Sequence, residues 1–390
     1  MRDILVICPQ ERDLNAIATA GLEERYRVHY AGSDLDQLDS FDPRAFLEES
    51  AGFPADGVVG SKDRSALLAA LLAERRGLPG PTPKALAAFQ HKPTSRALQA
   101  RVAPWAVPRF APLGAKPPFA FPFFVKPVVG RLSQNAMRVD GPADLHGLHE
   151  IDSYTTRYAQ IAELAGLDGN AAHGFLAEEL LEGMEVTYEG YVHRGRVTTI
   201  GVTDSVKYPG TNSFERFEYP TTLSEARQAE IEEIAARVVP AHGFDGGFFN
   251  LELFVPDEGP ARIIEVNGRL ASQFAPLVQA LHGRSTYDAL FELACGHDPR
   301  WRTGRPNGVG VSYCLRVFED AFVDGAPDPE EGLELLVRPG LHLSEQGVND
   351  AQSYRLCILY GVGETREEAV RICRERARAL SFRLAPARVR

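Results

Sequence analysis

The segment Arg262–Arg269 places a carboxylate and an amide at the end of an apolar run, and both are groups that bind divalent cations. Side chains alternate along a strand, so Glu265 and Asn267 are expected to point to the same face of a sheet. The preceding apolar run, Phe248–Val255, carries Glu252. If the two runs pair as an antiparallel hairpin, the two glutamates lie side by side. Such carboxylates repel each other unless a proton or a cation sits between them.

Hard oxygen ligands of this kind suit Mg²⁺, which takes one or two carboxylates and completes its shell with phosphate oxygens and water. The sequence therefore predicts a magnesium site at Glu252, Glu265 and Asn267. The other interpretation is that both strands end in solvated acidic side chains. The residue types alone do not decide between the two.

Two lysines are candidates for holding phosphate groups. Lys126 closes the apolar run Phe123–Lys126, and the small-residue loop after it contains Gly130 and Ser133. A lysine is a compact positive donor, and backbone N–H groups of such a loop can face phosphate oxygens. Lys92 stands near the start of a helical stretch. The alternative for each is a solvated lysine at the end of a strand or a helix.

The segment Phe175–Glu185 joins two predicted strands at an acidic, apolar bend. Backbone edges at such a bend can read an adenine, leucines can pack on its face, and a carboxylate can accept hydrogen bonds from a ribose. The candidates for nucleotide binding are Glu178, Glu179, Leu180, Leu181 and Glu185. The alternative is an ordinary acidic hairpin.

These residues need a scaffold, and the apolar periodicity predicts one. Short apolar runs at Ile4–Cys8, Tyr26–Tyr30 and Gly57–Gly60 alternate with helical stretches, which favours an open parallel α/β domain. The turn Pro9–Arg12 lacks the G-x-G-x-x-G pattern, so this domain is not expected to bind a dinucleotide.

A Pro/Gly-rich linker at Leu78–Pro83 marks the end of this domain. One helix is expected from about Lys84 through Arg101, followed mostly by strands with a few helices. The segment Val202–Pro220 is polar and rich in turn residues. We hypothesise that it is a mobile flap over the site, with an ordinary long hairpin as the alternative.

The chain has 390 residues, with 42 Lys and Arg against 53 Asp and Glu, and a net charge of −11. An acidic chain gives no bulk electrostatic reason to bind nucleic acid. No run approaches the ~18 apolar residues of a membrane span. The N-terminus does not resemble a signal peptide, and the cysteines are widely spaced. We therefore expect a cytoplasmic protein with no nucleic-acid or membrane partner.

Taken in this order, the motifs resemble the ATP-grasp superfamily, and in particular its carboxylate–amine ligases such as the L-amino-acid ligases. The resemblance runs from about Pro83 to about Gly296. It implies a Rossmann-like N-terminal α/β domain followed by an ATP-grasp fold with two α+β lids. The implied domains are 1–82, a small lid with its linker helix at 83–182, and a large lid with a C-terminal α+β subdomain at 183–390.

The resemblance also implies a role for each candidate residue. ATP is held by phosphate contacts from Lys92, Lys126 and the loop of Ser133. The adenine pocket and the ribose contact are made by the Phe175–Glu185 segment, with Glu185 on the ribose. Two Mg²⁺ ions are bound by the glutamate pair and Asn267, and Arg269 faces an acyl phosphate and the oxyanion of a tetrahedral intermediate. The chain departs from the family pattern at Asn250, a position that is often histidine in amino-acid ligases.

The implied activity is ATP-dependent joining of a carboxylic acid to an amine through an acyl phosphate, with release of ADP and phosphate. The implied substrates are small molecules, namely amino acids or small peptides, and the implied assembly is a homodimer. Two alternatives stay open. One is a carboxylase-type ATP-grasp enzyme that activates bicarbonate, and the other is a non-catalytic nucleotide-binding scaffold.

Overall fold

The computed structural model describes residues 1–386 except 36–37, 39, 131–134, 149–151, 303, 347–349 and 351–352. The chain divides into two compact units. Unit 1 comprises Met1–Gly201, Leu223–Ser272 and Thr286–Trp301, and unit 2 comprises Val202–Thr222, Gln273–Ser285 and Arg302–Arg390. Residues 183–390 contribute to both units, so the boundaries of the two units differ from those of the three domains expected from the sequence. The three domains 1–82, 83–182 and 183–390 stay a prediction.

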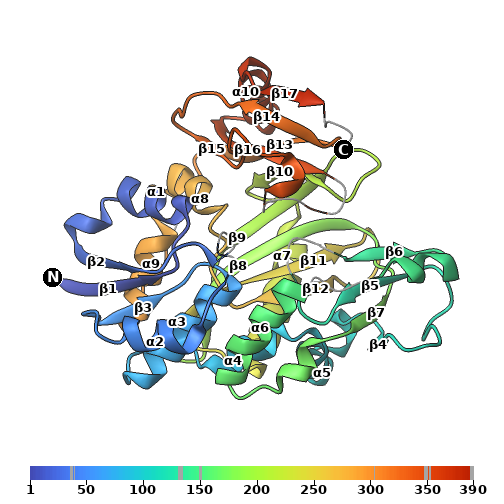
Figure 1. Cartoon of the computed structure of the whole chain (residues 1–390), viewed down its shortest axis with the longest axis horizontal. Helices are drawn as coiled ribbons and strands as arrows, with labels where there is room; N and C mark the ends of the chain where they lie inside the picture. Colours follow the sequence, from blue (N-terminus) through green and yellow to red (C-terminus); the bar gives the residue numbers. More distant parts are fainter. Residues whose placement is uncertain are drawn as a thin grey trace. The chain divides into compact units, whose positions relative to one another are not determined.

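Unit 1 begins with a parallel sheet of three strands in the order β2-β1-β3. Its strands are β1 (Arg2–Ile7), β2 (Tyr26–Ala31) and β3 (Gly57–Val59), and its helices are α1 (Glu11–Thr19), α2 (Pro43–Ser50) and α3 (Asp63–Arg75). The apolar residues of β1 are buried, and α3 packs against β1 and β3 (Figure 1). The parallel α/β arrangement expected from the sequence is confirmed.

Two helices follow the linker, where one was expected. They are α4 (Pro83–Gln90) and α5 (Lys92–Val102). His91 between them has an extended backbone (φ −84°, ψ 95°), and its ring nitrogen accepts the N–H of Thr94. Pro93 in the first turn of α5 is compatible with a helix start but not with the middle of a helix. The break places Lys92 at the N-terminus of α5, where its backbone N–H donates to the carbonyl of Val128.

A second, antiparallel sheet in unit 1 has the order β4-β7-β5-β6. Its strands are β4 (Phe110–Pro112), β7 (Phe175–Glu179), β5 (Phe123–Pro127) and β6 (Met137–Val139). Phe123, Val125 and Ala177 form part of its core and are fully buried. Helix α6 (Asp152–Leu164) packs beside the end of β5 through Tyr158, which contacts a core that includes Val129.

The third sheet of unit 1 has the order β12-β11-β8-β9. Its strands are β8 (Met184–His193), β9 (Arg196–Lys207), β11 (Gly247–Val255) and β12 (Arg262–Asn267). Helix α7 (Glu225–Ala241) packs against α5, and α9 (Thr286–Ala294) packs against β3 and β11. The antiparallel hairpin of β11 and β12 expected from the sequence is confirmed.

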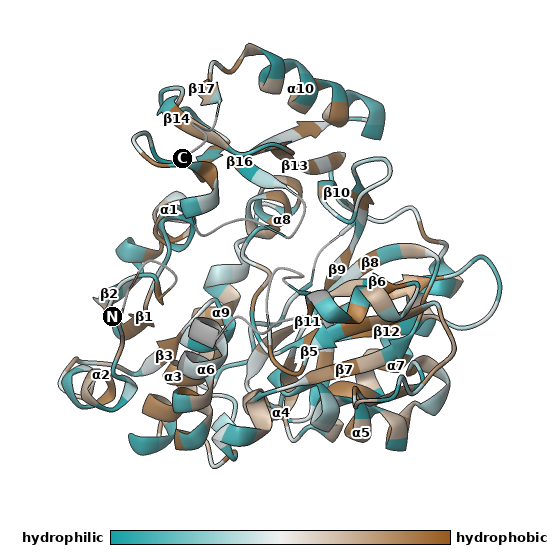
Figure 2. Ribbon diagram, turned by 45° about the vertical axis from the view of Figure 1, so that its right-hand side comes forward, coloured by the Kyte–Doolittle hydropathy of each residue, from teal (hydrophilic) through white to brown (hydrophobic). Residues whose placement is uncertain are grey.

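Strand β9 continues from unit 1 into unit 2, where the strand order is β9-β10-β13-β16-β15. The remaining elements of unit 2 are β10 (Phe214–Tyr219), α8 (Ala275–His282), β13 (Val309–Val317), β14 (Ala321–Gly325), β15 (Leu333–Leu335), β16 (Tyr354–Gly363), α10 (Arg366–Ala379) and β17 (Arg383–Pro386). Helix α10 covers a core that includes Leu359 and Cys373, and the rest of this helix is largely hydrophilic (Figure 2).

The segment 202–220 is a β-hairpin of β9 and β10, and β10 also pairs with β13. This pairing agrees with the hairpin that the sequence offered as the alternative, and a mobile flap over 202–220 stays a hypothesis. No helix within the described residues is both long and apolar enough to span a membrane.

Candidate active site

Two rows of polar side chains cross strands β12, β11 and β8 of unit 1. The first row consists of Glu265, Glu252 and Thr187, and the second of Asn267, Asn250 and Glu189. Members of a row are direct cross-strand partners, and the two rows lie two residues apart along each strand. All six side chains therefore project from the same face of the sheet.

The three predicted magnesium ligands come together in these rows. Glu252 and Glu265 are register partners, as the sequence predicts. The amide nitrogen of Asn267 donates to Oε1 of Glu252 at 3.2 Å and to Oδ1 of Asn250 at 2.9 Å. Burial, and then the neighbouring Glu265, raise the pKa of Glu252 to about 8.

This donor set fits Mg²⁺. Within the described part of the chain, no group of three or more His, Cys, Asp and Glu side chains is arranged to hold a metal by itself. Two carboxylates and an amide oxygen are instead a partial ligand set, and Mg²⁺ completes such a set with phosphate oxygens and water. The repulsion between Glu252 and Glu265 is relieved when a cation lies between them.

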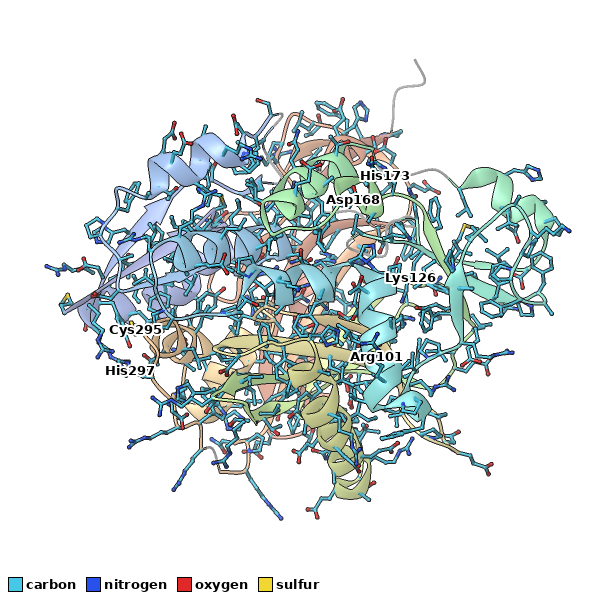
Figure 3. The ribbon with its side chains drawn as sticks, turned by 90° about the horizontal axis from the view of Figure 1, so that it is seen from below. Arg101, Lys126, Asp168, His173, Cys295 and His297 are labelled. Atoms are coloured by element: carbon cyan, nitrogen blue, oxygen red, sulfur yellow. The ribbon has the colours of Figure 1, made fainter. Side chains whose placement is uncertain are left out.

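Both predicted phosphate-binding lysines lie beside β12. Nζ of Lys92 is 3.2 Å from Oε1 of Glu265. Nζ of Lys126, which is labelled in Figure 3, donates to the carbonyl of Ile264 at 3.0 Å and lies 2.9 Å from Oε2 of Glu178. Burial lowers the pKa of Lys126 to about 8, although Glu178 opposes this shift. Two cations therefore stand next to the carboxylate pair.

Glu178 is held in a buried ion-pair network, and its contact with a nucleotide stays a prediction. Its carboxylate accepts from Arg96 Nε at 2.7 Å and from Arg96 Nη2 at 3.1 Å, and it also pairs with Lys126. Burial alone raises its pKa, but these two cations outweigh that effect and bring the pKa to about 2. The charge of Glu178 thus keeps Lys126 in place.

Arg96 was not predicted as part of the site. It is 2% exposed, and its Nη2 donates to the carbonyl of Ile264 at 2.7 Å, the same oxygen that Lys126 contacts. One signal was available in the sequence. Lys92 and Arg96 are four residues apart, and residues at this spacing share a helix face.

The other residues of the predicted nucleotide segment have different surroundings. The carboxylate of Glu179 pairs with Arg109 at 2.9 Å and with Arg262, on the strand face opposite to Glu178. Leu180 and Leu181 are half-buried in the connection between β7 and β8.

Glu185 begins the same face of β8 that carries Thr187 and Glu189, and its charge contributes to the raised pKa of Glu252. The carboxylate of Glu185 therefore interacts electrostatically with Glu252. Ser133 lies outside the described residues.

Arg269 lies two residues beyond the end of β12, and three hydrogen bonds fix this arginine and the turn around it. Its Nε donates to Oδ1 of Asp63 at 2.8 Å, and Asp63 is the first residue of α3. Its carbonyl accepts from the side chain of Asn250 at 3.1 Å. The N–H of Ala271, two residues on, donates to Oε1 of Glu189 at 2.7 Å. Asp63 and Glu189 were not predicted from the sequence.

Unit 2 contains a cavity of about 420 Å³ between β10 and α10. Its lining includes Arg216, Glu218 and Arg366. Glu218 is buried and pairs with both arginines. These three charges are thus engaged with one another.

Residues 119–276 match the family model of the ATP-grasp domain. This range contains Lys126, the two register-paired glutamates and Arg269. The chain therefore carries an ATP-grasp domain, and its fold is the ATP-grasp fold that the resemblance implied, with a Rossmann-like N-terminal domain.

Among curated proteins, the chain is similar to human carnosine synthase 1, with 27% identity over 281 residues. The match covers 68% of this chain and 34% of that protein, so the chain spans about a third of its relative's length.

Among solved structures, the chain resembles the L-amino acid ligase from Bacillus licheniformis. The TM-score is 0.79 at 18% identity, and the match covers 98% of each chain. The biotin carboxylase domain of 2-oxoglutarate carboxylase from Hydrogenobacter thermophilus has a TM-score of 0.71 at 13% identity, covering 98% of this chain and 91% of that one. These likenesses show the shared fold.

Proposed function

We propose that this chain is an ATP-dependent ligase that joins a carboxylic acid to an amine, with amino acids or small peptides as substrates. The observation that carries the proposal is the direct opposition of Glu252 and Glu265, with Lys92 and Lys126 beside them and Arg269 at the end of the same hairpin. This arrangement suits a reaction in which a phosphoryl group is transferred and an anion then forms on oxygen.

The first step activates the carboxylic acid. One of its oxygens attacks the γ-phosphorus of ATP, the bond to the bridging oxygen breaks, and ADP leaves with that electron pair. In this proposal Lys92 and Lys126 offset the charge of the phosphates, and such positioning and charge stabilisation supply most of the catalysis in phosphoryl transfer. Glu252, Glu265 and Asn267 are the residues that would hold Mg²⁺, which would supply further positive charge for the phosphates.

The second step forms the amide. The amine nitrogen attacks the carbonyl carbon of the acyl phosphate and gives up a proton, and the C–O bond to phosphate breaks. Negative charge develops on the carbonyl oxygen during the attack. Arg269 is the group proposed to stabilise that charge, and its backbone and side chain are both fixed by hydrogen bonds before any substrate arrives.

The names of two relatives support an amine as the second substrate. They are the carnosine synthase and the L-amino acid ligase. The fold is shared with a biotin carboxylase domain, so a carboxylase that activates bicarbonate is the second candidate. That domain's structure is described as a dimer, and a homodimer of this chain stays a prediction that gel filtration tests.

The test is a phosphate-release screen with ATP, Mg²⁺ and pairs of amino acids, followed by mass spectrometry of the products. The proposal predicts ADP and phosphate only when a carboxylate and an amine are both present, together with a condensed product. Formation of AMP contradicts it and indicates adenylation. Bicarbonate-dependent ADP formation without an amine favours the carboxylase, and nucleotide binding without turnover favours the scaffold.

A further inference from the structure

Glu189 is a buried acidic side chain that forms no salt bridge in the described part of the chain. It lies in the middle of β8 and is 4% exposed. Its Oε1 accepts the N–H of Ala271 at 2.7 Å. Its Oε2 receives no hydrogen bond from the described residues. Oε2 is also not one of the fully buried side-chain atoms that have no hydrogen-bond partner. This oxygen is therefore not completely enclosed by the protein.

Holding the turn after β12 does not by itself require a carboxylate. An amide oxygen accepts one N–H equally well, and Asn250, the cross-strand partner of Glu189, fixes the same turn with an uncharged side chain. Burying an unpaired carboxylate is costly, and burial raises the pKa of Glu189 to about 8. The nearby cation, Arg269, donates its Nε to Asp63 instead.

The position of Glu189 matches the place where an amine has to arrive. It projects from the face that carries Glu252 and Asn267, and it contacts the turn that carries Arg269. If Arg269 contacts the carbonyl oxygen of the activated acid, the nucleophile approaches the carbon beside that oxygen. A carboxyl oxygen at this place accepts hydrogen bonds from amine N–H groups and orients them, and a cationic amine beside it favours the ionised form of Glu189.

We propose that Glu189 binds the amine substrate through Oε2, as the recognition group for the ammonium or amino group of an amino acid or a similar primary amine. This assignment rests on the proposed ligase function. It makes Glu189 a binding residue of the acceptor, whereas Asn250 only positions the turn.

The test is the variant Glu189→Gln. Glutamine keeps one oxygen to accept the N–H of Ala271 and replaces the other with a donor, so the turn is preserved while the amine loses its acceptor. We expect the KM for the amine to rise about ten- to a hundredfold, because a hydrogen bond to a charged group is lost. The KM values for ATP and for the carboxylic acid should stay unchanged.

Hydroxylamine, an uncharged nucleophile near neutral pH, supplies the second readout. It traps the acyl phosphate as a hydroxamate without needing the hydrogen bond to Glu189. The E189Q variant should therefore form hydroxamate at the rate of the unaltered protein. Glu233→Gln, on the exposed face of α7 in the same unit, is the matched control and should change neither rate.

The outcomes separate the two proposals. An unaltered protein that shows no amine-dependent turnover overturns the ligase function and this assignment with it. An active ligase whose E189Q variant keeps its KM for the amine overturns the assignment alone. Equal losses with the amine and with hydroxylamine also overturn it, because they indicate that Glu189 acts only by holding the turn.

Discussion

Asp63 and Arg269 form an ion pair at 2.8 Å although they stand 206 residues apart in the sequence. Asp63 is the first residue of α3, and Arg269 lies two residues beyond the last residue of β12. The N-terminal α/β domain thus contributes directly to the orientation of the arginine that we assign to the carbonyl oxygen.

Replacing Arg269 by alanine should lower product formation by about 10²- to 10³-fold, because one donor to the developing oxyanion is lost. The affinity for ATP should survive, since Lys92 and Lys126 are untouched. Steady-state kinetics and calorimetric ATP titration measure the two effects. Equal losses of turnover and of ATP affinity would count against the proposed role of Arg269.

Asp63→Asn is the matched variant for the same ion pair. It keeps Arg269 but removes the charge that orients it, so kcat should fall less than in R269A. A displaced catalytic group costs up to roughly 10²-fold. An unchanged kcat would show that the ion pair does not govern catalysis.

The pH dependence of kcat/KM for ATP should reflect the ionisation of Lys126. Its pKa is lowered from 10.5 to about 8, so the lysine loses its proton, and its attraction for phosphate, as pH rises through about 8. The value of kcat/KM for ATP, which reports the free enzyme, should therefore fall above about pH 8. In Lys126→Arg the side chain stays charged, and this fall should vanish. A profile that stays flat in the unaltered protein would contradict the prediction.

Removing Arg96 should destabilise unit 1, because the carboxylate of Glu178 stays buried without its bidentate partner. Breaking a buried ion pair from one side costs about 3–5 kcal/mol. Urea unfolding of Arg96→Met measures this cost. Arg101→Met is the control, since Arg101 lies on the same helix but is exposed, and an equal effect in both variants would refute the prediction.

Gly268, between Asn267 and Arg269, permits a close approach to α4. A Cβ atom here would lie 2.5 Å from Cδ2 of Leu86 and 2.8 Å from Cδ2 of Phe89, both buried. Gly268→Ala should lower the free energy of unfolding by about 1–3 kcal/mol through overpacking. Gly114→Ala, where the added Cβ meets no atom within 4 Å, should be neutral. Thermal unfolding compares the two variants.

Binding of Mg²⁺ with ADP should stabilise the protein through Glu252 and Glu265. A ligand at a hundred times its Kd adds about 2.7 kcal/mol to the free energy of unfolding. Glu265→Gln should remove most of the part that depends on the metal, and EDTA should remove it from the unaltered protein. Equal stabilisation by Mg²⁺ in E265Q and in the unaltered protein would argue against this metal site.

The pair of Glu252 and Glu265 is also the part of the site that the sequence predicted most directly. The pairing of Glu252 with Glu265 was expected from the short connection Pro256–Pro260, but the irregularity in register between Glu252 and Leu253 was not. Lys92 and Lys126 were predictable as strand-end or helix-end cations. Their convergence on β12 depends on packing between distant segments, and the resemblance supplied that information.

Arg96, Asp63 and Glu189 could not be recognised from the sequence because their partners are remote. Arg96 and Glu178 are 82 residues apart, as are Glu189 and Ala271. No local periodicity carries such contacts. The break of the expected single helix at His91 was missed for a different reason: the propensities of the flanking residues outweighed the signal from Pro93.

The central claim is that the carboxylic acid is activated by direct phosphoryl transfer at the Glu252 and Glu265 pair. The most direct measurement uses a substrate labelled with ¹⁸O in its carboxylate and follows the label by mass spectrometry. The account predicts that one ¹⁸O atom per turnover appears in the released phosphate and that E265Q slows label transfer and product formation together. Label found in AMP, or phosphate released without ¹⁸O while product accumulates, would contradict it.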